Sequence, residues 1–367
     1  MWNLIPEPRE RPFWERTLYW LGVVFLATWK ALHLPKNMWI SPIRSILNNW
    51  TWGMYGVVIR SWVTRAYIDQ PCTFNKHPER LEPKAEVDPL YRLSTRDLAF
   101  FFENGYIGPF DGFAEDEVKA LVETMARKRQ RRSSNFGIVT DRDLHLETPA
   151  MLHFMSHPAI LERAAELLGP DLLSWRSQLF FKPPGGREIQ WHQASTYMME
   201  DYLEPALIPP DRNELFQLTV WIALGPVTKE NGALQFVPGS HDRIRTIRFG
   251  GPQGFYAVNF QLEFDVDPHK VVTLEMKTGQ FVIFSERMIH GSGPNQTSAM
   301  RCAMNYRLIP TDVKVYQGQS HHRAMHMGNS YSLQNWGVVL LRGTDRFGYN
   351  KMAAVEIPHN ASRAAPN

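Results

Sequence analysis

The sequence predicts an α+β chain whose core is an all-β sandwich or barrel, preceded by a helical, tryptophan-rich extension. Helical patterns occupy much of the chain up to Leu168, and short runs rich in β-branched and aromatic residues follow. Glycine- and proline-rich turns, such as Pro183–Gly186 and Pro238–Gly239, separate these runs. Helices first and many short strands afterwards are typical of a β-core with flanking helices.

The composition is that of an enzyme-sized globular protein of 367 residues. A hydrophobic content of 44% with 21% charged residues excludes a largely disordered chain. Lys and Arg number 40 against 37 Asp and Glu, a balance that excludes a dedicated nucleic-acid binder. Cys72 and Cys302 are the two cysteines, so a disulfide framework and a zinc–cysteine cluster are both excluded. We therefore expect an enzyme of a reducing compartment, with a cytoplasmic location.

The first ninety residues differ in character from the rest. Eight of the 12 tryptophans fall in the first 62 residues, and residues 16–68 contain no acidic side chain. The uncharged run Thr17–Trp29 has 13 residues, fewer than the ~20 that a membrane-spanning helix needs. Two interpretations stay open at this point: residues 1–68 contact a membrane interface peripherally, or they form an apolar cap on the catalytic domain or a dimer surface.

We predict three parts along the chain. Residues 1–90 form the apolar, basic extension, which ends in a proline-containing linker over Pro71–Pro89. Residues 91–355 form the catalytic domain, and residues 356–367 form a tail.

Three helices are expected in the first part of the catalytic domain. Ser94 with an acid three residues later, Asp97, predicts a helix start, and Asn104-Gly105 predicts its end. A second, charged helix is expected over Ala114–Arg127. A third is expected over Ile160–Leu168, where Gly169-Pro170 ends it.

The expected core strands are short and mostly apolar. They are Ser177–Lys182, Leu218–Leu224, Gln280–Phe284 and Ala303–Ile309. Alternation places Arg301 and Arg307 on one face of the last run, together with Ala303 and Asn305, and places Cys302, Met304 and Tyr306 on the other. Guanidinium groups on the inward face of a β-core are costly unless they meet anions. An anionic small molecule is therefore expected inside the core.

Two histidines stand out by their surroundings. His192 lies in the segment Gln190–Ala194 after the glycine-rich turn, and His290 follows an apolar strand, with Arg301 eleven residues later. This spacing resembles that of the phytanoyl-CoA dioxygenase-like iron(II)/2-oxoglutarate enzymes. Family pieces also occur at Asn231–Leu234, Pro238–His241 and His290–Asn295. The resemblance implies a double-stranded β-helix (jelly-roll, cupin-like) core and a 2-His-1-carboxylate iron site.

Position 194 departs from that pattern. The third ligand of the family is Asp or Glu, whereas Ala194 carries a methyl group, which cannot bind iron. Within the superfamily the same loss defines the halogenases, in which a chloride ion occupies the vacated position. The chain is similar to these chlorinating enzymes, typified by the syringomycin threonine halogenase, along most of residues 97–350. The first ninety residues have no counterpart in the resemblance.

The resemblance also implies roles for individual residues. His192 and His290 would bind Fe(II), and Arg301 would hold the distal carboxylate of 2-oxoglutarate through a bidentate contact. The histidines at 153, 157, 241, 269, 321 and 322 are expected to be structural.

A halide pocket is implied beside the iron. Ala194 would leave room for chloride, and Thr219 and Arg307 match positions near the halide. Gln178 stands where the threonine halogenase has a glutamate, so polarity is kept while the charge is lost.

The expected activity is halogenation of an unactivated C–H carbon with Fe(II), 2-oxoglutarate, O2 and chloride, giving succinate and CO2, in natural-product biosynthesis. The substrate is expected to be a small molecule, lipid-like or tethered to a carrier protein. A second hypothesis is a hydroxylase of the phytanoyl-CoA dioxygenase type whose carboxylate ligand comes from Glu200 or Asp201. A third is a non-catalytic binding or membrane-scaffold protein that keeps the fold.

Overall fold

The structure is a computed structural model of the 367-residue chain. It describes residues 13–40, scattered positions between 43 and 68, and residues 82–130, 141–194, 206–211, 213–245, 247–249, 260–262, 264–324 and 329–356.

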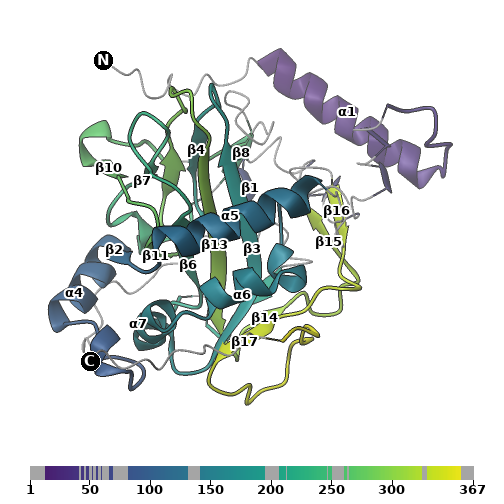
Figure 1. Ribbon diagram of the computed structural model, residues 1–367. Coiled ribbons are helices and arrows are strands. Elements are labelled where there is room, and N and C mark those ends of the chain that lie inside the picture. Colours follow the sequence, from purple (N-terminus) through teal and green to yellow (C-terminus); the bar gives the residue numbers. More distant parts are fainter. Residues whose placement is uncertain are drawn as a thin grey trace.

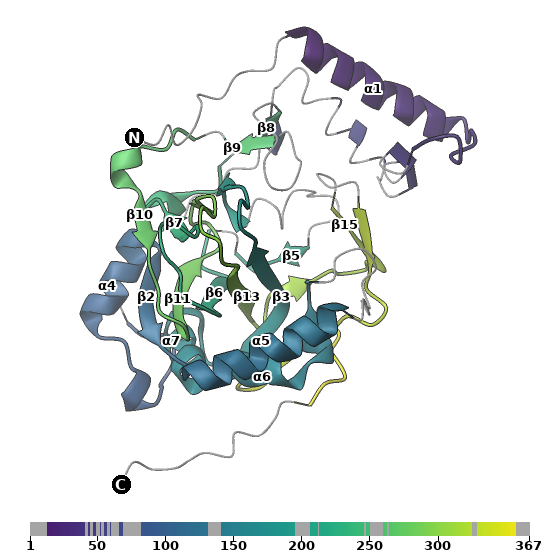
Figure 2. The same cartoon turned by 45° about the horizontal axis from the view of Figure 1, so that its top comes forward.

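Among the described residues, one long helix lies in the extension and four α-helices lie at the start of the catalytic domain. The extension contains α1 (Phe13–Ala31). The others are α4 (Thr95–Asn104), α5 (Glu115–Gln130), α6 (Pro149–Met155) and α7 (Pro158–Leu168). In Figures 1 and 2, α5, α6 and α7 lie together against the sheets, while α1 lies apart at the edge of the molecule.

Two antiparallel sheets form the core. The larger has six strands in the order β17 (Val339–Arg342), β3 (Leu172–Lys182), β13 (Arg301–Pro310), β6 (Leu218–Ala223), β11 (Gln280–Ser285) and β2 (Tyr106–Asp111). The smaller has the order β10 (Val272–Leu274), β7 (Leu234–Phe236), β12 (His290–Ser292) and β4 (Ile189–His192).

Three small sheets flank this core. One joins β1 (Ala66–Ile68), β8 (Ile247–Phe249) and β9 (Phe260–Leu262). The others pair β14 (Lys314–Val315) with β5 (Leu207–Ile208), and β15 (His321–Ala324) with β16 (Asn329–Ser332).

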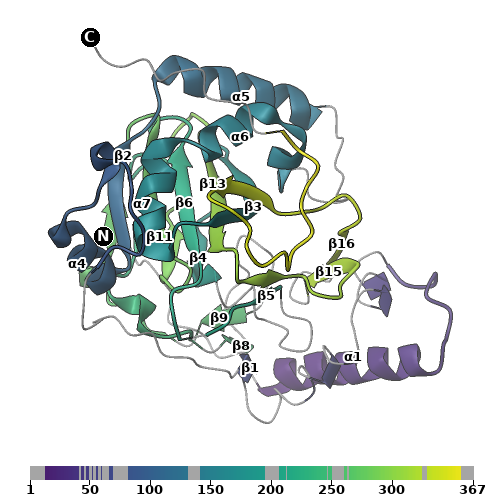
Figure 3. The same cartoon turned by 90° about the horizontal axis from the view of Figure 1, so that it is seen from below.

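The large sheet is buried on both faces. Its outer face packs against the helices, where Val220 of β6 and Tyr306 of β13 join Phe101 of α4 and Ile160 of α7 in one apolar cluster. Figure 3 shows α5 and α6 on this side.

The inner face meets the small sheet. Trp221 of β6 and Ala303 of β13 form a second apolar cluster with Phe236 of β7 and Leu274 of β10. Even-numbered residues of β13 thus face the helices and odd-numbered ones face the small sheet, as the alternation predicts. The inward face is where the sequence places Arg301 and Arg307.

Most predicted elements are present with shifted ends. Ser94 caps α4 in a capping box with Asp97, and Gly105 ends that helix in the left-handed conformation at φ 84°. The strand expected from Ser177 begins at Leu172.

Several elements were not predicted from the sequence. Among them are the short strands of the small sheet, the short helix α6, and strand β2, which interrupts the expected succession of helices. The β2 segment contains Gly108 and Pro109, which argue against a strand. It becomes an edge strand because it pairs with β11, with Tyr106 opposite Phe284.

Candidate functional site

His192 and His290 lie side by side on neighbouring strands. His192 ends β4 and His290 begins β12, and the two are paired in the antiparallel register. Their ring centroids are 4.1 Å apart with the ring planes at 50°. A cross-strand pair brings two side chains to one face within a few ångströms, so residues separated by about a hundred positions converge here.

The hydrogen bonds of both rings set their tautomer. His192 Nδ1 lies 2.7 Å from the carbonyl oxygen of Gln190, and His290 Nδ1 lies 2.8 Å from that of Met288. A carbonyl oxygen only accepts, so each Nδ1 carries the proton and donates. The lone pair of each ring is then on Nε2, and this tautomer is common in metal-binding histidines.

Both imidazoles are neutral at neutral pH. Burial lowers the pKa of His192 to about 4, assisted by the positive charge of Arg307. Burial also holds the pKa of His290 well below its usual value, and His192 and Arg307 add to this effect. Neutral imidazole is the form that binds a metal, so the two residues fit an iron site.

The third position of the motif lacks a donor. Ala194 is buried and belongs to an apolar cluster that includes Trp175 and Phe216. Within the described ranges, no group of three or more His, Cys, Asp or Glu side chains could hold a metal ion. Glu200 and Asp201, the alternative carboxylates, lie outside the described residues.

A buried pair of cations lies at the other end of the inward face. Arg301 is opposite Lys182 in the β13–β3 register, and their exposed fractions are 3% and 2%. A guanidinium N–H of Arg301 donates to the Gly232 carbonyl at 3.3 Å, and its Nε has no hydrogen-bond partner. Burial lowers the pKa of Arg301 to about 10. Two buried cations without a described carboxylate partner favour an anionic ligand.

Lys182 was missed from the sequence. Its Nζ donates to the Ser292 hydroxyl at 2.7 Å and to the Gly293 carbonyl, both just beyond His290. Burial and then the charge of Arg301 lower the pKa of Lys182 to about 7. The β13 alternation predicts Arg301, but only the register of β13 with β3 brings Lys182 beside it.

Gly232, in the Asn231–Leu234 motif, lies close to both Lys182 and Arg301. It adopts φ +87°, and a Cβ there would lie 2.9 Å from Lys182 Cδ and 2.5 Å from the Gly293 oxygen. Only glycine leaves room for the Lys182 stem while its carbonyl accepts from Arg301.

The halide-pocket candidates share the inward face. Thr219 is opposite Arg307 in the β6–β13 register, and Gln178 is opposite Asn305 on the other side of β13. The Thr219 hydroxyl is buried and has no hydrogen-bond partner. Arg307 is close enough to the two histidines to lower both of their pKa values. An orphaned hydroxyl beside a cation is suited to an anion or an ordered water.

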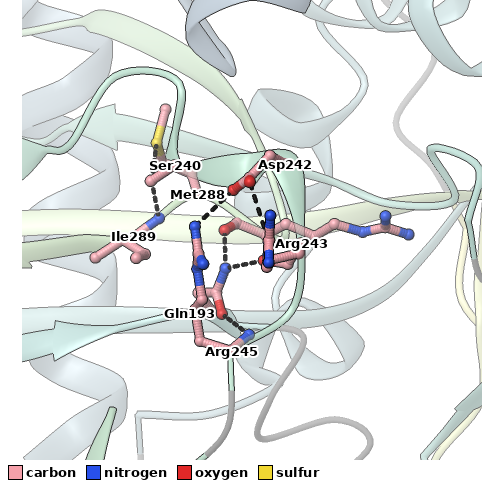
Figure 4. Close-up of polar contacts among 8 residues, drawn as sticks. Gln193, Ser240, Asp242, Arg243, Arg245, Met288 and Ile289 are labelled. Atoms are coloured by element: carbon pink, nitrogen blue, oxygen red, sulfur yellow. Dashed lines mark hydrogen bonds and ion pairs between the residues drawn. The ribbon is translucent and has the colours of Figure 1, made fainter. Parts of the chain in front are cut away.

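Gln193 connects the two histidine segments (Figure 4). Its fully buried side chain donates from Nε2 to the carbonyls of Arg243 and Arg287, and accepts from the Arg245 amide at 2.7 Å. Arg287 lies on the turn that leads to His290, and Ser240 accepts from the Ile289 amide at 3.0 Å on the same turn. One amide therefore ties the end of β4 to the start of β12.

Comparison with known proteins connects this fold and site to characterised enzymes. A family model for phytanoyl-CoA dioxygenase matches residues 101–303. The chain is 26% identical over 251 residues to phytanoyl-CoA dioxygenase domain-containing protein 1 of Danio rerio, covering 66% of this chain and 76% of that protein. It is 27% identical over 231 residues to ectoine dioxygenase of Sphingopyxis alaskensis, covering 56% and 72%.

Solved structures agree with these matches. CytC3 with Fe(II) and alpha-ketoglutarate (2-oxoglutarate) has a TM-score of 0.57 and 26% identity, covering 72% of this chain and 93% of that one. EctD from S. alaskensis with bound Fe has a TM-score of 0.52 at 19% identity, covering 68% and 88%, and shares the fold.

These matches define the class of protein: an oxidoreductase of the Fe(II)/2-oxoglutarate-dependent oxygenase superfamily. Within that superfamily the chain belongs to the phytanoyl-CoA dioxygenase family, whose model covers more than half of its length.

Proposed function

We propose that this protein is an Fe(II)- and 2-oxoglutarate-dependent halogenase that replaces a C–H hydrogen of its substrate with chlorine. The observation that carries the proposal is Ala194, which stands two residues after His192 where the family motif has a carboxylate. Its methyl group supplies neither a ligand for the iron nor the negative charge that a carboxylate would carry. A chloride ion has the charge and size to supply both.

The donor set fits iron in this form. His192 and His290 supply two neutral imidazoles that carry the proton on Nδ1, and each would bind the metal through Nε2. When bound, the iron supplies the oxidation chemistry, with O2 and 2-oxoglutarate as co-substrates. The balanced reaction takes substrate, 2-oxoglutarate, O2, chloride and a proton to chlorinated substrate, succinate, CO2 and water.

The two core sheets position these residues. We assign them to a jelly roll, in which the small sheet carries both histidines and the large sheet presents Arg301, Arg307 and Thr219 from its inward face. In this assignment the catalytic unit is residues 91–355, and residues 1–90 and 356–367 lie outside it.

The cation pair serves as the anchor for 2-oxoglutarate. Arg301 and Lys182 bind its distal carboxylate, and the partnerless Nε–H of Arg301 gains an acceptor. The charge of the dianion offsets the cost of burying two cations.

The halide pocket is formed by what surrounds Ala194. Thr219 supplies an orphaned buried hydroxyl, directly or through an ordered water, and Arg307 supplies a positive charge near both histidines. Gln178 keeps a polar side chain on the same face without adding a second negative charge.

Hydroxylation is the second candidate function. Most of the named relatives are dioxygenases, among them ectoine dioxygenase and the phytanoyl-CoA dioxygenases. It requires a third protein ligand, for instance Glu200 or Asp201.

The test is a comparison of metabolites from the source organism with and without this gene, grown with chloride and then with bromide. A halogenase predicts a compound that carries chlorine, is replaced by its bromine analogue in bromide medium, and disappears on deletion. The substrate then follows as the compound that accumulates, which distinguishes a free small molecule, a lipid-like molecule and a carrier-tethered group. An oxygenated product that persists without halide would favour the hydroxylase.

A further inference from the structure

Helix α1 presents a continuous apolar stripe to solvent. Trp14, Leu18, Leu21 and Phe25 follow one another at spacings of 4, 3 and 4, which places them on one face of the helix. Their exposed fractions lie between 49% and 60%. Large apolar side chains continue along the turn after the helix: Leu32, Met38 and Ile40 are all highly exposed.

The opposite face of α1 packs against other parts of the extension. Val23 is buried, and Trp20 donates its indole N–H to the Ile59 carbonyl at 3.1 Å. Lys30 donates to the Leu47 carbonyl at 3.1 Å. The helix is therefore packed against the rest of the extension on one side, while the stripe stays uncovered. Contiguous apolar surface of this kind marks an interaction site.

The catalytic core does not cover the stripe, since its four side chains remain 49–60% exposed. Figures 2 and 3 place α1 at the edge of the molecule on the side opposite α5. Because the stripe is not buried against the β-core, its apolar side chains are more consistent with a partner outside the chain.

Charge selects the kind of partner. Residues 16–68 contain no Asp or Glu, while they contain six basic residues at 16, 30, 36, 44, 60 and 65. A second copy of the chain would bring another acid-free, basic segment against this one, which opposes self-association. An anionic lipid headgroup layer complements both features, because it offers negative charge above an apolar interior.

The length and apolar character of the helix together decide how it meets the lipid. No helix in the described part of the chain is long and apolar enough to cross a membrane. An amphipathic helix that cannot span lies in the interfacial plane, with its apolar side chains in the acyl boundary and tryptophans at headgroup level.

We propose that residues 13–40 form a docking surface for an anionic lipid bilayer, with the Trp14–Leu18–Leu21–Phe25 stripe inserted and Lys36 at the headgroups. The extension also joins the core near the site: β1 pairs with β8, and β9 of the same sheet contacts β4, which carries His192. Docking thus brings the enzyme to a surface where amphiphilic molecules are concentrated.

The test uses the full-length protein and sedimentation with vesicles of phosphatidylcholine alone or of phosphatidylcholine mixed with phosphatidylglycerol. We expect binding to the mixed vesicles, with affinity reduced ~10- to 100-fold in the double variant Leu18→Gln/Phe25→Gln. Lys36→Gln should lower affinity several-fold, with a smaller dependence on salt. The matched control is Phe347→Gln, an apolar residue of the catalytic domain that is about as exposed as Phe25, and it should bind like the unmodified protein.

Two results overturn the proposal. One is that Leu18→Gln/Phe25→Gln binds mixed vesicles as tightly as the unmodified protein. The other is that the unmodified protein ignores the vesicles and is a dimer by light scattering, and that the double variant is a monomer, which makes the stripe an interface between copies. Both exposed substitutions leave the buried face of α1 intact, and circular dichroism verifies that the variant is folded.

Discussion

Lys182 and Arg301 are direct partners across β3 and β13, and both side chains are almost wholly buried. Lys182 is held by a hydroxyl and a carbonyl just after His290, and Arg301 by the Gly232 carbonyl. Glu188 offsets only part of the charge on Lys182, so two buried cations otherwise held by neutral groups favour an anionic ligand. This relationship underlies the assignment of the 2-oxoglutarate anchor.

Removing either cation should weaken 2-oxoglutarate binding. A hydrogen bond to a charged group contributes about 1.5–3 kcal/mol, so Lys182→Met should raise the dissociation constant ~10- to 150-fold. Titration calorimetry with the Fe(II)-loaded protein in the absence of O2 measures this. Lys119→Met, on the exposed surface of α5, is the control and should leave the constant unchanged. If Lys182→Met and the unmodified protein bind 2-oxoglutarate with equal affinity, Lys182 does not contact its carboxylate.

The affinity for 2-oxoglutarate should also depend on pH. Without ligand the pKa of Lys182 is about 7, lowered by burial and by Arg301 and partly restored by Glu188. Above pH 7 the free protein must take up a proton to present a charged Lys182, so affinity should fall by up to about tenfold per pH unit. The measurement is the dissociation constant between pH 6 and pH 9. Lys182→Met should flatten the pH dependence of the affinity. An unchanged pH dependence in that variant would mean that another group titrates.

The lowered pKa of Lys182 also predicts that the stability of the ligand-free protein rises with pH, while its affinity for 2-oxoglutarate falls. Folding lowers the pKa of Lys182 from its usual 10.5, so the folded protein binds fewer protons between about pH 7 and that value. Below pH 7 the buried charge destabilises the ligand-free fold, and this cost is relieved as the pH rises. Lys182→Met should therefore raise the free energy of unfolding more at pH 6 than at pH 9. Denaturant unfolding at both values tests this, and a larger gain at pH 9 would contradict it.

Gln193 should position both histidines through its amide. In Gln193→Glu a carboxylate oxygen replaces the N–H donor that faces two carbonyls, so the end of β4 and the turn before His290 should separate. Loss of an interaction that orients metal ligands typically costs 10- to 100-fold in metal affinity, and we expect about that loss for Fe(II). Gln334→Glu, at an exposed position, is the control. A variant with normal Fe(II) affinity and a normal near-ultraviolet spectrum would show that the amide has no positioning role.

Thr219→Val should separate halide binding from stability. The Thr219 hydroxyl is buried without a partner, so its replacement by a methyl group of similar shape should leave the free energy of unfolding equal or slightly higher. The chloride concentration that half-saturates the Fe(II)–2-oxoglutarate protein should rise several-fold. A large loss of stability with unchanged chloride dependence would mean that the hydroxyl serves the fold.

Local sequence patterns indicate some residues of the candidate site directly, and others only tertiary pairing brings in. His192, His290 and Arg301 could be predicted because local motifs mark them, and the register confirms that the two histidines meet. The inward alternation of β13 was also predictable, since a period of two needs no tertiary information.

Other contributions depend on pairings that no local pattern encodes. Lys182 enters only through its register with Arg301, and Gln193 only through carbonyls that lie about 50 and 94 residues away. Strand β2 was missed because its Gly108 and Pro109 oppose a strand locally, whereas pairing with β11 outweighs that preference. The apolar character of α1 was visible in the sequence, but which of its faces stays exposed was not.

The central claim is that a halide occupies the iron coordination position beside Ala194. X-ray absorption at the iron edge measures this directly on the Fe(II)–2-oxoglutarate protein in bromide, because bromine scatters far more strongly than nitrogen or oxygen. The account predicts one bromine neighbour of iron in the unmodified protein and none in Ala194→Asp, while Ala194→Gly keeps it. Iron surrounded by nitrogen and oxygen alone in the unmodified protein, with bromide in excess, would contradict the account.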